Sequence, residues 1–152
     1  MNIINTLNEG TNALYKNNII NPQLDSEILL SSSIQKDKKH IILNPKEPLN
    51  LSQLEKFQSL IERRKKGEPI AYLINKKEFW KYEFYVNKDV LIPRPDTEVI
   101  IEEVLKIYTE KSQSQVLDIG TGSGCILLSI IKERPNLYGT GIDISKKSIN
   151  VS

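Results

Sequence analysis

Three glycines stand within five positions in the stretch VLDIGTGSGCILLSI, which covers residues 116–130. The apolar run before them predicts a buried strand, and the apolar stretch from Cys125 to Ile131 predicts a helix. A glycine-rich turn between a strand and a helix directs backbone N–H groups and the positive end of the helix towards a ligand, and no Cβ blocks the approach. The turn therefore predicts a site for a nucleotide-like ligand.

The elements around this turn indicate the fold class. The first strand is expected at Gln115 to Ile119, the helix continues to about Glu133, and a second strand follows at Tyr138 to Asp143. Strand, helix and strand in this order are typical of the opening of a parallel α/β sheet.

The glycine spacing favours one cofactor over another. The dinucleotide fingerprint requires a third glycine or alanine at the position of Cys125, so the NAD pattern fails there. Asp143 ends the second strand, where a carboxylate can accept both ribose hydroxyls of a nucleoside. Together these features favour S-adenosylmethionine, whose compact amino-acid end needs no pyrophosphate cradle. The alternative is a tight turn with no ligand. The candidate cofactor-binding residues are Asp118, Gly120, Thr121, Gly122, Ser123, Gly124 and Asp143.

The pattern of residues 3 to 66 predicts helices, because apolar side chains recur there at helical spacing. The clearest is SQLEKFQSLIERRKKG, at residues 52–67, where we expect Ser52 and Glu55 to form a capping box and Gly67 to end the helix. The cations at its C-terminal end suit the helix dipole better than they indicate an RNA contact. The apolar stripe consists of Leu54, Phe57, Leu60 and Ile61.

Short strands or a hairpin are expected next, because Trp80, Tyr82, Phe84 and Val86 alternate along the chain. We expect this aromatic set to pack two domains together. Two prolines then force an extended segment, after which Asp96 or Thr97 is expected to cap a helix. The face of that helix is expected to carry Ile100, Val104 and Tyr108.

Composition excludes several classes of protein. The formal net charge of +2 gives little attraction to nucleic acid. The single cysteine, Cys125, excludes an internal disulfide and is expected to be a small buried side chain, and with the lone His40 it leaves too few ligands for a zinc site. The first twenty residues show no basic stretch followed by an apolar core, and no run of eighteen apolar residues occurs in the sequence. We expect a cytoplasmic protein with no metal, no membrane span and no direct nucleic-acid partner.

A longer stretch, RRKKGEPIAYLINKKEFWKYEFYVNKDVLIPRPDTE at residues 63–98, resembles the release factor glutamine methyltransferase family, as does LDIGTGSGCI at residues 117–126. The resemblance implies an α/β protein with three parts. These are an N-terminal α-helical substrate-recognition domain at residues 1–74, a β-hairpin linker at 75–92, and the start of a Rossmann-like S-adenosylmethionine-dependent methyltransferase domain at 93–152. Asn75 stands where the family usually has glycine, and asparagine tolerates the left-handed conformation that this position requires.

The resemblance also implies an activity. The family transfers a methyl group from S-adenosylmethionine to the side-chain amide of the glutamine in the Gly-Gly-Gln loop of peptide chain release factors. An Asn-Pro-Pro-Tyr loop positions that amide. This sequence has no such loop, since its Asn-Pro pairs continue with Gln23 and Lys46. We therefore assign no catalytic residue here, and expect an incomplete domain that is inactive alone and a monomer at full length. Arg94 and Thr97 are carried over as possible substrate or pocket contacts.

Two other functions remain open at this point. The chain could be a non-catalytic fragment that only binds a release factor. A nicotinamide-dependent oxidoreductase is the weaker alternative, because Cys125 occupies the third position of the dinucleotide fingerprint.

Overall fold

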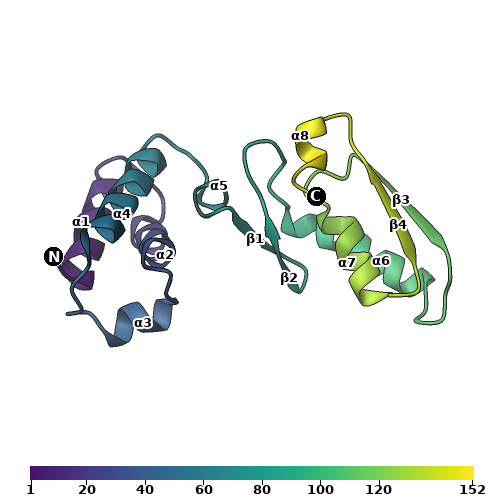
Figure 1. Cartoon of the computed structure of the whole chain (residues 1–152), viewed down its shortest axis with the longest axis horizontal. Helices are drawn as coiled ribbons and strands as arrows, with labels where there is room; N and C mark the ends of the chain where they lie inside the picture. The colour runs from purple at the N-terminus through teal and green to yellow at the C-terminus, as the bar shows by residue number, and fades with distance from the viewer. The chain divides into compact units, whose positions relative to one another are not determined.

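The computed structural model describes residues 1–152, which form two compact units, Met1–Ile74 and Asn75–Ser152. The first unit contains only helices, and the second combines two small sheets with helices (Figure 1). None of the helices is both long and apolar enough to cross a membrane.

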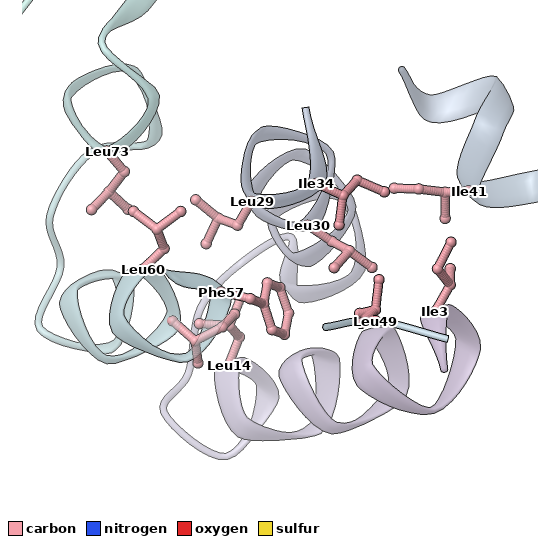
Figure 2. Close-up of a cluster of buried hydrophobic side chains, with 11 residues drawn as sticks. Ile3, Leu14, Leu29, Leu30, Ile34, Ile41, Leu49, Phe57, Leu60 and Leu73 are labelled. Carbon is pink, nitrogen blue, oxygen red and sulfur yellow. The ribbon is translucent and has the colours of Figure 1, made fainter. Parts of the chain in front are cut away.

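Five helices build the first unit: α1 (Ile3–Tyr15), α2 (Pro22–Ile34), α3 (Lys38–Leu43), α4 (Leu51–Lys65) and α5 (Ile70–Ile74). Every one of them contributes to a single apolar core, which Figure 2 shows in close-up. The predicted stripe of α4 is confirmed, since Phe57, Leu60 and Ile61 are buried and Leu54 packs against the core. The helical prediction for this part of the chain is therefore correct.

A glycine lets α1 approach its neighbours closely. A Cβ added at Gly10 would lie 2.5 Å from Cζ of Phe57 on α4 and 2.6 Å from Oγ of Ser26 on α2. That serine hydroxyl donates to the carbonyl of Leu7 at 3.2 Å, so α1 and α2 also share a polar contact. Any larger residue at position 10 would push the three helices apart.

The capping box of α4 lies two residues before the predicted one. The helix begins at Leu51, the Asn50 side chain accepts from the N–H of Gln53 at 2.9 Å, and the Gln53 side chain accepts from the N–H of Asn50 at 3.0 Å. The prediction of a Ser52–Glu55 box was wrong, because both pairs have the required spacing and the helix starts at the earlier one.

The cations at the end of α4 are paired with acids of the same unit. The Nε of Arg64 lies 2.7 Å from Oδ2 of Asp25, and both side chains are largely buried. Arg63 pairs with Glu68, and Lys65 pairs with Glu62. Three of the four cations therefore have structural partners, in agreement with the structural interpretation of this basic run.

The second unit opens with a hairpin of β1 (Lys76–Phe79) and β2 (Tyr82–Tyr85). The alternating residues predicted from the sequence span both strands and the turn between them. Trp80 lies in that turn and has a φ of +59°. The chain enters the hairpin through Asn75, whose φ is +56° and whose Nδ2 donates to the carbonyl of Val86 at 3.0 Å. The expected left-handed asparagine is confirmed.

A short 3-10 turn, η1 (Pro95–Thr97), leads into α6 (Glu98–Ile107). Neither Asp96 nor Thr97 caps this helix with its side chain, so that prediction was wrong. Of the predicted face, Val104 and Tyr108 do pack against the core, but Ile100 is 46% exposed and the fully buried Ile101 takes its place.

The second sheet pairs β3 (Gln115–Ile119) and β4 (Tyr138–Ile142) in parallel, with α7 (Cys125–Glu133) between them and α8 (Lys146–Ile149) after them. The predicted strand, helix and strand are all present in the predicted order. A Cβ at Gly139 would lie 2.3 Å from Cδ1 of Ile131, so α7 packs directly against β4.

The hairpin packs inside the second unit. Oε1 of Glu133, at the end of α7, accepts from Nε1 of Trp80 and from the hydroxyl of Tyr82, each at 3.0 Å, and Oε2 accepts from Nζ of Lys81 at 3.0 Å. Phe79 joins the core of this unit. These contacts hold the hairpin against α7, and the expected packing of the aromatic set between two domains stays a prediction.

Candidate cofactor-binding site

The three glycines of the loop between β3 and α7 all have a positive φ: +82° at Gly120, +57° at Gly122 and +75° at Gly124. Other residues adopt this conformation only at a cost, which explains the glycine spacing. A Cβ at Gly120 would have nothing within 4 Å, and one at Gly122 would meet only a carbonyl oxygen at 3.9 Å. One side of the loop is therefore open to a ligand.

The N–H groups of this loop have partners within the chain. Those of Gly120 and Thr121 donate to the carbonyl of Ile142 at 2.8 and 3.0 Å, and that of Gly124 donates to the carbonyl of Thr121 at 2.8 Å. The expectation that the loop directs its N–H groups at a ligand is corrected for these positions. The first two attach the loop to β4 and the third closes a turn within the loop, so none of the three forms a cradle for an anion.

Asp143 directly follows β4 and lies beside the loop. Its Oδ2 accepts from the N–H of Gly122 at 3.0 Å, and its Oδ1 accepts from the N–H of Ser145 at 2.9 Å. The N–H of Ser145 and then that of Gly122 lower the pKa of this carboxyl below its ordinary value of 3.8, while burial opposes them. The side chain is half-buried. Each oxygen keeps a further lone pair, so the carboxylate can still accept hydroxyl groups.

Two other predicted residues have buried polar atoms with no partner. These atoms are Oδ2 of Asp118 and Oγ1 of Thr121. A Cβ at Gly141 would lie 2.9 Å from the Thr121 hydroxyl, so this glycine makes room for it. An unsatisfied buried polar group costs about 1–3 kcal/mol, and a ligand that supplied partners would recover part of that cost. These oxygen atoms, one a carboxylate acceptor and one a hydroxyl, therefore fit a polar ligand.

The first turn of α7 is buried beneath the loop. Ser123 and Cys125 are both buried, and burial raises the pKa of the Cys125 thiol. The expected structural role of this cysteine agrees with the structure, because a thiol with a raised pKa is a poor nucleophile at neutral pH.

Arg94 and Thr97 lie on the segment between the hairpin and α6. Arg94 is exposed, Thr97 is half-buried, and neither side chain hydrogen-bonds to the glycine loop. Their assignment as pocket or substrate contacts stays a prediction.

Sequence patterns did not reveal two long-range contacts of the second unit. Glu98 accepts from the N–H of Trp80 at 2.8 Å, and the Ser148 hydroxyl donates to the carbonyl of Asp89 at 3.0 Å. The one available signal was the cap of α8, where Ser145 accepts from the N–H three residues later.

Comparison with known proteins identifies the first unit. Residues 5–74 match the family model described as the PrmC N-terminal domain. A protein of Caulobacter vibrioides named release factor glutamine methyltransferase is 40% identical over 131 residues, which are 86% of this chain and 45% of that protein. The chain resembles the N-terminal portion of the release factor glutamine methyltransferases. The resemblance expected from the sequence is therefore shown.

Other relatives agree. A release factor glutamine methyltransferase of Buchnera aphidicola is 44% identical over 131 residues, covering 86% of this chain and 47% of the relative. A bifunctional methyltransferase of Rickettsia bellii is 39% identical over 172 residues, covering 96% of this chain and 31% of the relative. The chain thus spans about a third to a half of the length of the curated relatives it matches, and these relatives are named as methyltransferases.

Proposed function

We propose that the second unit binds S-adenosylmethionine at the glycine loop. The observation that carries this proposal is the Asp143 carboxylate, held by the N–H groups of Gly122 and Ser145 beside an open loop. Asp143 would hold the ribose hydroxyls, and the unpartnered atoms of Asp118 and Thr121 would meet other polar groups of the ligand. Bound S-adenosylmethionine supplies an electrophilic methyl group on its sulfonium. Gly120, Gly122, Ser123 and Gly124 complete the assigned site.

We also propose that a full-length protein with this sequence at its N-terminus methylates the glutamine amide in the Gly-Gly-Gln loop of peptide chain release factors. The names of its relatives support this assignment. In this division of roles, residues 1–74 recognise the release factor, residues 75–92 form a linker, and residues 93–152 begin a Rossmann-like methyltransferase domain. We further propose that it acts in the cytoplasm, as a monomer at full length.

The 152 residues contain no Asn-Pro-Pro-Tyr sequence and hence no group assigned to hold the amide. We therefore expect this chain alone to transfer no methyl group. A non-catalytic chain that binds a release factor is the second candidate function, and it is favoured by the presence of the helical domain matched at residues 5–74. A nicotinamide oxidoreductase is disfavoured by the engaged N–H groups of the glycine loop, which leave it few donors for a pyrophosphate.

Isothermal titration calorimetry tests the cofactor. The chain is expected to bind S-adenosylmethionine and not NAD, and Asp143→Ala should weaken binding about tenfold or more, because charged hydrogen bonds to the ligand are lost. Asp96→Ala is the matched control, since this exposed carboxylate lies in the same unit without a capping contact. Tighter binding of NAD would support the oxidoreductase instead, and unchanged affinity in Asp143→Ala would remove that residue from the site.

Transfer of labelled methyl groups to a release factor tests the substrate. The Caulobacter vibrioides relative serves as the positive control for the assay. No label is expected on the release factor with the 152-residue chain alone. Label on its glutamine would show that the Asn-Pro-Pro-Tyr loop is dispensable.

A further inference from the structure

A chain of hydrogen bonds links Asp143 to the segment that follows the hairpin. Ser145 donates its N–H to Oδ1 of Asp143 at 2.9 Å and accepts the N–H of Ser148 on its Oγ at 3.3 Å. The Ser148 hydroxyl then donates to the carbonyl of Asp89 at 3.0 Å. The last of these bonds joins Ser148 to Asp89, 59 positions away. The other end of the chain of hydrogen bonds is the Asp143 carboxylate.

The accepting carbonyl of Asp89 lies in a turn that is itself held in place. The N–H of Asp89 donates to Oδ1 of Asn87 at 2.8 Å, and the N–H of Val90 donates to the carbonyl of Asn87 at 3.2 Å. Val90 is also buried, which fixes the turn from a second side. The carbonyl is therefore a fixed point to which α8 can be attached.

The helix α8 depends on such an attachment. It has four residues, and a helix this short is not stable by its own hydrogen bonds. Ile149 is 41% exposed and offers only partial packing, whereas Ser148 is 5% exposed. The other polar link, from Lys147 to the Asp89 carboxylate, spans 3.8 Å with a largely exposed lysine, and such pairs contribute little.

We infer that Ser148 is a positioning residue for Asp143: its hydroxyl fixes α8 on the turn at Asp89, and α8 in turn holds the Ser145 N–H on the carboxylate. One part of the inference, that Ser148 affects the binding of S-adenosylmethionine, rests on the proposed function. The placement of Asp143 itself is a property of the protein without ligand.

Amide hydrogen exchange of the 152-residue chain, followed by NMR, tests the placement directly. Ser148→Ala should raise the exchange rate of the Ser145 N–H about fivefold, the effect of losing one ordinary hydrogen bond, and Ser148→Thr, which keeps the hydroxyl, should restore the protection. Asp89→Ala removes the carboxylate but keeps the carbonyl, so it should leave the rate unchanged. Ser129→Ala removes a fully buried hydroxyl that has no partner and should also change nothing.

Calorimetry with S-adenosylmethionine on the same variants separates the two claims. If Ser148→Ala leaves the Ser145 exchange rate unchanged, or if Asp89→Ala raises it as much, the positioning role is wrong. If the exchange rate rises in Ser148→Ala and both Ser148→Ala and Asp143→Ala weaken binding, both claims hold. If the exchange rate rises but Asp143→Ala binds normally, the positioning stands and the proposed cofactor site fails. If Ser148→Ala binds S-adenosylmethionine normally while Asp143→Ala binds it more weakly, Ser148 does not affect cofactor binding. Only that part of the inference is then wrong.

Discussion

The N–H of Gly122 donates to Oδ2 of Asp143 across 3.0 Å, although 21 positions separate the two residues in the sequence. The bond joins the glycine loop after β3 to the end of β4, which are neighbours because the two strands are parallel and in register. A ligand that contacts the carboxylate therefore contacts a group whose position depends on the loop.

Acid should weaken the second unit through Asp143. Its pKa is lowered in the folded protein, so the carboxylate stabilises the fold fully above the ordinary value of 3.8. That contribution is lost as the pH falls through the lower folded value. Chemical unfolding at a series of pH values should show a smaller acid destabilisation for Asp143→Asn than for the wild type. Equal pH dependence in the two proteins would contradict the assigned hydrogen bonds.

Gly10→Ala should destabilise the first unit. The added methyl group would lie 2.5 Å from Phe57 and 2.6 Å from Ser26, well inside van der Waals contact, and overpacking of this kind costs about 1–3 kcal/mol. On an open helix surface the same substitution would stabilise the fold by about 1 kcal/mol. A loss of stability would therefore indicate the close packing around Gly10. Urea unfolding measures it. Asn12→Ala, at an exposed position of the same helix, is the control and should not destabilise.

Glu133→Ala should loosen the hairpin from α7. The carboxylate accepts from the side chains of Trp80, Lys81 and Tyr82, and these donors would lose their partner. Trp80 is the only tryptophan, so the tryptophan emission comes from this residue alone. A red shift of its emission is expected. Glu102→Ala, on the exposed side of α6, should leave the spectrum unchanged, and an unchanged spectrum in Glu133→Ala would contradict the account.

One face of the parallel sheet should promote association of the chain. Leu117 and Ile119 on β3, with Tyr138 and Ile142 on β4, are all between 45% and 76% exposed, whereas parallel sheets are normally covered on both faces. We expect sedimentation velocity to show concentration-dependent association of the 152-residue chain. The double variant Leu117→Thr with Ile119→Thr should reduce it, and Gln115→Thr should not. Association unaffected by the double variant would assign it to another surface.

Most elements could be predicted from the sequence because their signals are local. Apolar periodicity placed the helices of the first unit, and the glycine cluster placed the turn between β3 and α7. Asn75 was also correctly expected in a left-handed conformation. The capping box was missed because Asn50 with Gln53 and Ser52 with Glu55 have the same spacing, and side-chain packing decides between two starts that lie so close together.

The long-range contacts of the second unit could not be predicted. Glu98 reaches the N–H of Trp80 from 18 positions away, and Ser148 reaches Asp89 from 59 positions away, so neither contact leaves a periodic pattern. The residue types around the glycine loop were visible in advance. Which of the loop's N–H groups remain free depends on the pairing of the loop with Ile142 of β4, which is a tertiary feature.

The central claim is that S-adenosylmethionine binds at the glycine loop and Asp143, and amide chemical shifts map this most directly. On titration of the 152-residue chain with S-adenosylmethionine, the amides of residues 120–124 and 143–145 should shift together and saturate at one affinity, while those of the first unit stay in place. NAD at the same concentrations should leave them unmoved. Shifts confined to other residues, or none at saturating cofactor, would contradict the account.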